Sequence, residues 1–307
     1  MERAYRQIVV IGNPVAGGGA LEKVRRAVRL LNDRGCDVEL LLTEKRGDAV
    51  SFARRAAARH SRDNPLLVIA AGGDGTYNEV ANGLVFSEAP MAILPLGTTS
   101  VLAYELSIPH DLESALDIAL TGTPVSVHLG RITLPGRSAS RYFLLMAGAG
   151  FDGEVVMRVN EKLKKLSGRG AYILSGLKVL LGYRPAPITV RNRDRSLLGY
   201  TAIVGKAACY GGKLQIAKDA RLTDPHLYVF VTHKRGRLSL IRYVLGILRG
   251  VHLGFKDTAY FKTDRVEIDG TTPIQVDGDY VGHAPATIEI AADALRLVMR
   301  SGLNKGP

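Results

Sequence analysis

The first 120 residues alternate short apolar runs with longer segments in which apolar residues recur at helical spacing. Short apolar runs predict buried strands, and apolar residues three or four positions apart predict helices that cover those strands. Strands that alternate with helices form parallel sheets with helices on both faces. The alternation therefore predicts a doubly wound α/β domain over residues 1–124. The predicted strands are 8–11, 38–42, 66–71 and 91–94, and the predicted helices are 20–34, 48–60, 76–84, 98–106 and 111–120.

The pattern changes after Pro124, where short strand-like runs become dense and turn residues separate them. Closely spaced strands without intervening helices indicate antiparallel pairing. Two helical inserts interrupt the strands, at about 152–182 and 236–250. We therefore expect a C-terminal antiparallel β-sandwich domain over residues 125–290, with residues 291–307 packing back on the first domain. The predicted strands are 125–132, 142–147, 188–191, 201–206, 227–232, 259–263, 265–268, 274–276 and 287–290.

Basic residues are concentrated in the second half of the chain. The whole sequence has 41 Lys and Arg against 29 Asp and Glu, a net charge of +12. Residues 1–127 carry 13 basic and 15 acidic side chains, whereas residues 128–290 carry 25 and 13. The excess indicates that the second domain faces an anionic partner, unless it only solvates the surface. No nucleic-acid-binding module is recognisable and only 6% of residues are aromatic, so we expect no nucleic acid as partner.

The cysteines and apolar runs indicate a reducing compartment. Cys36 and Cys209 are the only cysteines, and there is no CxxC pair to form a zinc module. We expect both to be buried free thiols. The apolar run at residues 8–12 is too short for a signal peptide, and no run approaches the ~20 residues that span a bilayer. We expect a cytoplasmic protein, with peripheral association at the inner membrane face left open.

Three glycine-rich loops each follow a predicted parallel strand and open a helix. They are residues 12–19 (GNPVAGGG), 72–76 (GGDGT) and 95–98 (PLGT). The carboxyl ends of such strands form the ligand crevice of an open α/β sheet, and glycine lets backbone N–H groups approach a phosphate. The loops predict a phosphate-binding cleft. A Walker motif, GxxxxGK[ST], is absent, and so is GxGxxG after the first strand, which argues against Walker-type NTPases and ordinary Rossmann dehydrogenases.

The second loop, Gly72-Gly73-Asp74-Gly75-Thr76 with Asn78 and Glu79 close behind, resembles the signature shared by NAD kinases and the diacylglycerol/sphingosine lipid kinases. The first and third loops resemble those of the lipid kinases. The resemblance implies a Rossmann-like nucleotide domain, ATP and Mg²⁺ as cofactors, and a lipid such as diacylglycerol or a sphingoid base as phosphoryl acceptor. The cofactor-binding residues that it implies are Asn13, Pro14, Gly17, Gly18, Gly72, Gly73, Gly75, Thr76, Asn78, Glu79, Gly97 and Thr98.

Three segments of the second half extend the resemblance over nearly the whole chain. Ala147–Asp152 resembles the family's GxGFD segment, whose Asp joins a magnesium network. Ala217–Asp224 resembles a segment whose Asp holds a structural metal, and Val276–Asp279 resembles the late DGE motif, whose acid is the general base. The resemblance therefore implies Asp152 and Asp224 as metal ligands.

Phosphoryl transfer to an alcohol requires a base within about 3 Å of the hydroxyl. Asp279 is our candidate base and His283 a second choice, while a plain hairpin turn is the alternative role of Asp279. We expect Asp74 and Asp152 to hold Mg²⁺, which neutralises the phosphoryl charge, although each carboxylate could instead cap a helix.

Four residues depart from the family pattern. The third loop has Ser100 and Val101 where the family reads Asn and often Asp, the late motif ends in Asp279 rather than Glu, and Pro225 replaces a Gly. An NAD kinase and a catalytically weak, lipid-binding relative therefore remain alternatives.

Two basic segments, 158–178 and 233–248, also carry apolar residues. Basic residues beside an apolar face suit an anionic membrane surface. The alternative is that these helices only cover the β-rich domain.

Overall fold

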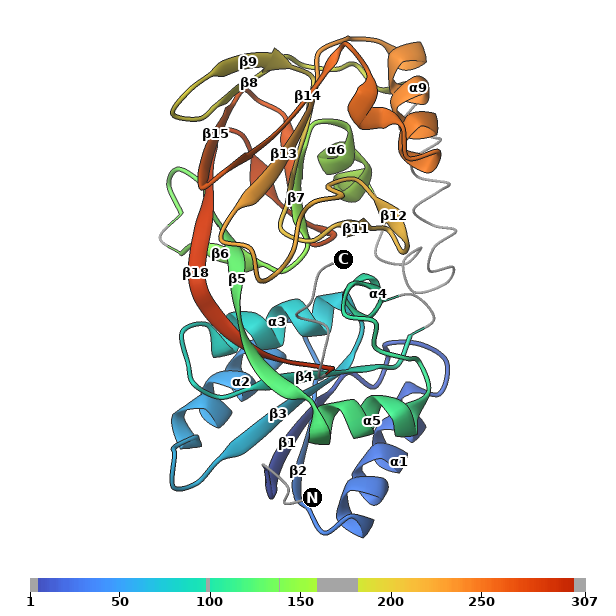
Figure 1. Cartoon of the computed structure of the whole chain (residues 1–307), viewed down its shortest axis with the longest axis vertical. Coiled ribbons are helices and arrows are strands. Elements are labelled where there is room, and N and C mark those ends of the chain that lie inside the picture. The colour runs from blue at the N-terminus through green and yellow to red at the C-terminus, as the bar shows by residue number, and fades with distance from the viewer. Residues whose placement is uncertain (1–4, 98–99, 138, 159–181, 301–307) are drawn as a thin grey trace. The chain divides into compact units, whose positions relative to one another are not determined.

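The computed structural model describes residues 5–97, 100–137, 139–158 and 182–300. The chain divides into two compact units, each described by itself (Figure 1). Unit 1 comprises Met1–Leu129 and Ala292–Pro307, and unit 2 comprises Gly130–Ala291. Strands β5 (Thr123–Thr133) and β18 (Ala286–Met299) contribute residues to both units. The sequence-based domain limit at residue 124 falls within β5.

Unit 1 contains the doubly wound sheet that the alternation predicts. Its strands are β1 (Gln7–Gly12), β2 (Asp37–Leu42), β3 (Leu66–Gly72) and β4 (Met91–Pro95). They lie in the order β2-β1-β3-β4, all parallel, and the end of β18 follows β4. Every residue of β3 and β4 is buried. A central strand buried on both faces reads as an unbroken apolar run, which is why the sequence locates it well.

The helices of unit 1 cover both faces of this sheet. They are α1 (Ala20–Asp33), α2 (Asp48–Arg59), α3 (Asp74–Leu84), α4 (Val101–Glu105) and α5 (Leu112–Thr121). α1 packs against α5, and α2 packs against α3, with the two pairs on opposite sides of the strands in Figure 1. Right-handed crossovers require this arrangement, because the chain reverses its direction across the sheet after β2. α4 is shorter than the helix predicted over 98–106.

Unit 2 is the predicted antiparallel β-sandwich. One sheet has the order β14-β13-β10-β7-β16-β17, and its strands are β7 (Met146–Ala149), β10 (Thr201–Gly205), β13 (Leu227–Thr232), β14 (Thr258–Thr263), β16 (Pro273–Val276) and β17 (Asp279–His283). The facing layer contains β18, β15 (Arg265–Asp269), β8 (Ile188–Arg191) and β9 (Ser196–Gly199), with β5 and β6 (Arg141–Phe143) beside β18.

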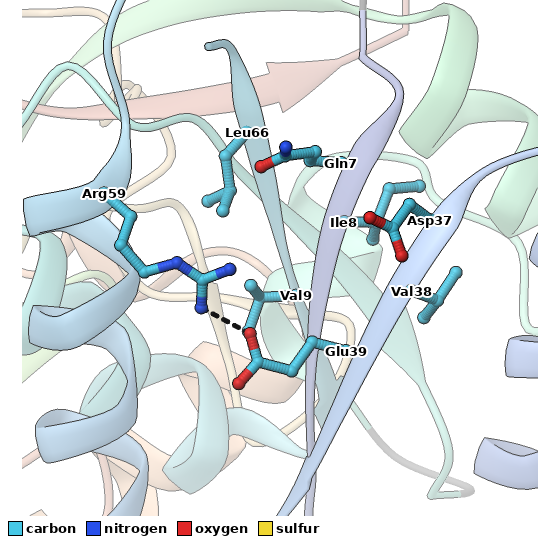
Figure 2. Close-up of a pocket in the computed structure, with 8 residues that line it drawn as sticks. All are labelled: Gln7, Ile8, Val9, Asp37, Val38, Glu39, Arg59 and Leu66. Atoms are coloured by element: carbon cyan, nitrogen blue, oxygen red, sulfur yellow. Dashed lines mark hydrogen bonds and ion pairs between the residues drawn. The ribbon is translucent and has the colours of Figure 1, made fainter.

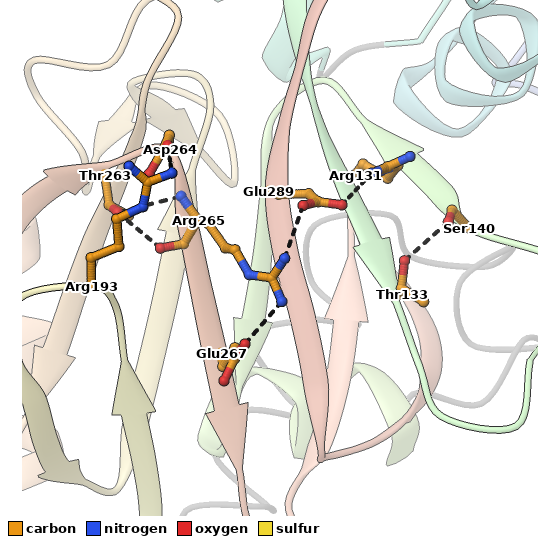
Figure 3. Close-up of polar contacts among 9 residues, drawn as sticks. All are labelled: Arg131, Thr133, Ser140, Arg193, Thr263, Asp264, Arg265, Glu267 and Glu289. Atoms are coloured by element: carbon orange, nitrogen blue, oxygen red, sulfur yellow. Dashed lines mark hydrogen bonds and ion pairs between the residues drawn. The ribbon is translucent and has the colours of Figure 1, made fainter.

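Buried aliphatic side chains from both layers form one core, with Val204 and Val229 from the first sheet and Val190 and Ile288 from the second. By contrast, the ion pairs that Figure 3 shows on β5, β15 and β18 are partly or fully exposed to solvent. Arg265 bonds Glu267 over 2.9 Å and reaches Glu289 over 3.5 Å. Exposed pairs of this kind contribute about 0–1 kcal/mol each, so the core and not the pairs stabilises the sandwich.

One predicted strand is wrong. Residues 142–147 form two strands, β6 and β7, with a break at Leu144 and Leu145. The backbone N–H groups of Leu144, Leu145 and Met146 donate to the carboxylate of Asp277 over 2.9–3.0 Å. A side chain from a distant turn thus replaces part of the strand ladder, which no local apolar pattern can signal.

Further short elements complete unit 2. They are α6 (Phe151–Arg158), the strand pair β11 (Cys209–Tyr210) and β12 (Leu214–Gln215), α9 (Arg237–Leu248) and a 3₁₀ turn, η1 (His252–Gly254). Most of the predicted 152–182 insert lies outside the described residues, as does the basic cluster within it. Cys36 and Cys209 are buried free thiols, as expected. No helix in the described part of the chain is long and apolar enough to cross a bilayer.

Candidate active site

The three glycine loops of unit 1 start side by side at one edge of the sheet. In the strand register, Gly12 pairs with Ala71, and Gly72 pairs with Pro95. The first and third loops also touch, since a Cβ added at Gly17 would lie 3.4 Å from the Cα of Gly97. The predicted convergence of the loops is therefore confirmed by the structure. Thr98 lies outside the described residues.

The first loop leaves its backbone accessible. The side-chain oxygen of Asn13 accepts a hydrogen bond from the backbone N–H of Val15 over 3.0 Å, which forms the turn through Pro14. Among the described residues, its chain neighbours aside, no heavy atom lies within 4 Å of where a Cβ at Gly18 would be. Helix α1 has Gly19 as its N-cap and no side chain capping its first turn. Backbone N–H groups at an uncapped helix start in open space are suitable donors for an anion.

The second loop combines packed and open positions. A Cβ at Gly72 would lie 2.5 Å from the Thr76 hydroxyl, so only glycine allows that close approach, whereas Gly73 and Gly75 face open space. Thr76 and Asn78 are buried. These buried residues pack beneath the loop, and the backbone of Gly73 and Gly75 is the part of the loop that faces open space.

Asn78 makes a contact within α3, and Glu79 ties α3 to the start of α2. The backbone oxygen of Asn78 accepts from the Asn82 amide over 2.8 Å, and Glu79 accepts from the backbone N–H of Gly47 over 3.1 Å. Glu79 thus holds the turn that opens α2. In this structure the contacts of Asn78 and Glu79 stabilise the helices next to the second loop.

Asp74 opens α3, and its carboxylate accepts hydrogen bonds from the start of α4. The backbone N–H groups of Val101 and Leu102 donate to it over 2.9 and 3.0 Å, and the Ser100 hydroxyl donates over 3.4 Å. Burial raises the pKa of Asp74, while these hydrogen bonds act against that rise. Asp74 therefore caps α4, 27 residues downstream, and not the helix that it opens.

Ser100 and Val101, which depart from the family pattern, belong to this cap. The Ser100 hydroxyl oxygen accepts from the backbone N–H of Ala103 over 3.1 Å, so Ser100 is the N-cap of α4. Val101 takes part through its backbone N–H, which every residue except proline supplies, and its side chain is buried. Together with Asp74 they join the second loop to the third.

In unit 2, Asp152 lies buried in the first turn of α6. The Tyr210 hydroxyl donates to one carboxylate oxygen, and the Gln275 amide donates to the other over 2.6 Å. Burial raises the pKa of Asp152, and both hydrogen bonds oppose the rise. A Cβ at Gly148 would lie 1.9 Å from the Asp152 carboxylate, so the glycine of the GxGFD segment is required for space.

Gln275 connects Asp152 to the late motif. Its amide oxygen accepts from the backbone N–H of Gly278 over 2.7 Å. Asp279 is the first residue of β17, and its carboxylate accepts from Arg141 over 2.6 Å. The turn itself is made by Asp277 and Gly278, both with positive φ. His283, the second choice as base, is exposed and bonded to the Tyr280 hydroxyl over 2.8 Å.

Sequence reasoning missed Asp277. Its carboxylate accepts from three consecutive backbone N–H groups of the β6–β7 break, and its φ of 46° is unusual for a residue with a side chain. The Asp-Gly pair was a visible turn signal, but its partner strand is more than 130 residues away. Asp277 therefore holds the segment that carries Asp279.

The contacts of Asp224 do not fit a structural metal. Its carboxylate oxygens bond His226 Nδ1 over 2.6 Å and the Tyr228 hydroxyl over 2.5 Å. The fully buried ammonium of Lys206 donates to the backbone oxygen of Asp224 over 2.8 Å and to that of Arg221. Partial burial alone would raise the pKa of Asp224, but Tyr228 and His226 lower it below its ordinary value. The Lys206 ammonium thus occupies the place of a cation at the backbone oxygen of Asp224, and its positive charge opposes a second cation there.

No group of three His, Cys, Asp or Glu side chains that could hold a metal exists within the described ranges. A nucleotide-bound Mg²⁺ usually keeps several waters and uses one or two carboxylates together with phosphate oxygens. Asp74 fits that pattern, since it lies beside open glycine backbone.

Figure 2 shows a pocket at the opposite edge of the unit 1 sheet. It lies where β1, β2 and β3 begin, at Gln7, Asp37 and Leu66, and an ion pair between Arg59 and Glu39 crosses it. Ligands of open α/β sheets bind at the carboxyl ends of the strands. The glycine loops, and not this pocket, are therefore the candidate nucleotide site.

Comparison with known proteins agrees with this geometry. Residues 7–132 match the diacylglycerol kinase catalytic domain, and residues 146–299 match the YegS C-terminal NAD kinase beta sandwich-like domain. The chain is 30% identical to diacylglycerol kinases of Bacillus subtilis over 284 residues and of Staphylococcus saprophyticus over 285, covering 90% of each chain in both cases.

A solved structure from Bacillus anthracis, described as a diacylglycerol kinase, aligns with a TM-score of 0.79 at 22% identity. The alignment covers 99% of this chain and 98% of that one. The matches extend from the first glycine loop through the β-sandwich. The chain belongs to the diacylglycerol kinase family.

Proposed function

We propose that this protein transfers the γ-phosphoryl group of ATP, with Mg²⁺, to the hydroxyl of a lipid such as diacylglycerol or a sphingoid base. Family membership makes it a phosphotransferase with an alcohol acceptor. The observation that carries the nucleotide part is the convergence of three glycine loops at the carboxyl edge of β1, β3 and β4, with Asp74 between the second and third.

The glycine backbone is suited to hold phosphate groups. Where a Cβ would be, Gly18, Gly73 and Gly75 have no neighbour within 4 Å among the residues that the structure describes, so phosphate oxygens can approach their backbone N–H groups. Lys23, in the second turn of α1, bonds the backbone oxygen of Leu96 over 3.3 Å and adds a positive charge near the third loop. Backbone amides and this lysine together take the role that a loop lysine has in Walker-type sites.

Mg²⁺ would neutralise charge on the transferred phosphoryl group when bound. Asp74 and Asp152 are the residues that would hold it, directly or through water. The Asp74 oxygen that accepts from the Val101 N–H keeps a second lone pair for a cation, whereas the other oxygen already accepts from Leu102 and Ser100.

Asp279 is our proposed general base, which accepts the proton of the lipid hydroxyl. Its ion pair with Arg141 orients the carboxylate, and its side chain remains 30% exposed, which leaves it accessible to a substrate. Asp277 supports this placement through its three backbone hydrogen bonds.

A panel of lipids with labelled ATP tests the proposed reaction. We expect a phosphorylated lipid only when Mg²⁺ is present, and phosphorylation of NAD instead would refute the lipid assignment. Asp279→Asn should lower turnover by about 100-fold or more with little change in the KM for ATP, since general bases contribute on that scale. Asp269→Asn is the matched control, because Asp269 is likewise paired with an arginine, Arg191, in unit 2. Equal loss of turnover and ATP affinity in Asp279→Asn would indicate a structural role.

We also propose that the enzyme works at an anionic membrane surface, where its lipid substrate resides. The basic excess of residues 128–290 supports this part of the proposal.

A further inference from the structure

Helix α9 exposes an apolar face that lies outside the buried core of the described part of unit 2. Leu238 is 84% exposed and Leu248 is 56% exposed. Monomeric proteins rarely leave large contiguous apolar patches in water without a function. The exposed apolar side chains are Leu238, Ile241, Val244, Leu245, Leu248 and, just beyond the helix, Val251.

These side chains form one stripe and not a scatter. At 100° per residue, the five positions within α9 fall in an arc of about 120°. The buried residues Leu240, Tyr243 and Gly246 lie on the remaining part of the helix surface. α9 is therefore amphipathic, with one face against unit 2 and an apolar face directed away from it. Figure 1 shows the helix at the margin of unit 2.

The inner face of α9 is anchored by specific contacts. A Cβ at Gly246 would lie 2.5 Å from the ring of Phe255, so helix and ring are in close contact. The Tyr243 hydroxyl donates to Asp257 over 2.8 Å, and Arg242 forms an ion pair with the same carboxylate. Arg242 also lies 4.6 Å from the centre of the Phe255 ring. The orientation of the apolar face is thus set by packing.

The exposed charges beside the apolar face of α9 are mostly basic, and the one acidic group that contacts α9 in the described residues, Asp257, is paired with Arg242 on the inner side. Residues 225–256 contain six Lys and Arg and no Asp or Glu. Five of the basic side chains are exposed and lie next to the apolar stripe in the chain: Lys234, Arg235, Arg237, Arg249 and Lys256. An apolar stripe bordered by basic residues matches a surface that is apolar inside and anionic at its rim. It does not match a second copy of α9, because the two basic borders would repel each other.

We propose that α9 lies flat in the headgroup region of an anionic lipid bilayer, with its apolar stripe inserted and the bordering basic residues against lipid phosphates. At 12 residues the helix is about 18 Å long, well short of the ~30 Å of a bilayer core, so it binds the surface and does not span. The proposal deepens the proposed function and rests on it, since a kinase of water-insoluble lipids must reach them in the membrane.

Vesicle sedimentation tests the docking face without requiring catalysis. The protein should bind vesicles of phosphatidylcholine mixed with phosphatidylglycerol more tightly than vesicles of phosphatidylcholine alone, and added salt should weaken binding. Leu238→Ser/Leu248→Ser should reduce binding by about tenfold or more, because two exposed apolar anchors are lost. Leu198→Ser is the control, since Leu198 is 61% exposed and lies on β9 and not on α9. Unchanged binding of the α9 variant would overturn the proposal.

A second pair of variants tests the charge. Arg235→Gln/Arg237→Gln should remove most of the preference for phosphatidylglycerol. Arg193→Gln/Arg195→Gln, which removes the same charge elsewhere in unit 2, should keep that preference. Equal effects of the two pairs would mean that only net charge matters and would overturn the assignment to α9.

Two measurements separate this proposal from its rivals. Sedimentation velocity should give the same mass for wild type and Leu238→Ser/Leu248→Ser, and a dimer lost in the variant would assign the face to a second copy instead. With a short-chain, water-dispersed lipid, the variant should retain wild-type turnover. Vesicle binding through α9 without phosphorylation of any lipid would support the docking face and refute the proposed function. Lipid phosphorylation by the wild type, with unchanged vesicle binding in the α9 variant, would support the proposed function and refute the docking face.

Discussion

Replacing Lys206 by methionine tests whether a buried ammonium, and not a metal, holds the segment around Asp224. Methionine keeps most of the length of the side chain and removes the charge. In the structure the Lys206 ammonium donates to the backbone oxygens of Arg221 and Asp224 and is fully buried. Its charge also lowers the pKa of the Asp224 carboxyl, after the larger effects of burial, Tyr228 and His226.

The expected loss follows from what remains after the substitution. Two part-buried carbonyl groups lose a charged donor, at a cost of about 1–3 kcal/mol each. Part of this is offset because a charge no longer has to be buried. We expect Lys206→Met to lose about 2–4 kcal/mol of stability. For a domain of this size that is a fall in Tm of roughly 5–12 °C.

Thermal melting without ATP, in EDTA and in excess Mg²⁺ or Ca²⁺, is the assay. The wild type should melt at the same temperature in EDTA and in either cation, because the carbonyl oxygens are already bonded. Lys262→Met is the control: Lys262 is exposed on β14, and its loss should change stability by no more than about 0.5 kcal/mol. A wild-type Tm that falls in EDTA by several degrees, or a Lys206→Met protein that melts like wild type, would refute this reasoning.

Two further predictions concern the buried carboxylates. Asp74→Ala should abolish phosphoryl transfer and lower stability by about 1 kcal/mol, because the cap of α4 is lost. Asp111→Ala removes the N-cap hydrogen bond of α5, so it should lower stability by about the same amount in a melting experiment and leave turnover intact. Equal losses of activity in the two variants would contradict the role of Asp74. Asp152→Asn should abolish activity without lowering Tm near neutral pH, because burial raises the pKa of Asp152 and makes its ionised form costly. A raised folded-state pKa means that wild-type stability is lost as pH rises through that pKa, so any advantage of Asp152→Asn should shrink as the solution is acidified; an advantage that grows in acid would have the wrong sign.

The sequence by itself determined most of the architecture. Strand and helix periodicity located β1 to β4 and the helices between them, because a strand buried on both faces is apolar throughout and an amphipathic helix repeats every three or four residues. The positions of the three glycine loops followed from the same pattern, since parallel strands bring their carboxyl ends to one edge. These features depend on local sequence or on general rules of chain topology.

Only the tertiary structure decided what the polar side chains do. Asp74 caps a helix 27 residues away, Asp277 interrupts a strand more than 130 residues away, and Lys206 bonds the backbone oxygens around Asp224. The outward direction of the apolar face of α9 also depends on contacts with η1 and the segment after it. Such contacts join residues that are distant in the chain. The local sequence does not specify these partners, because only folding brings them close together.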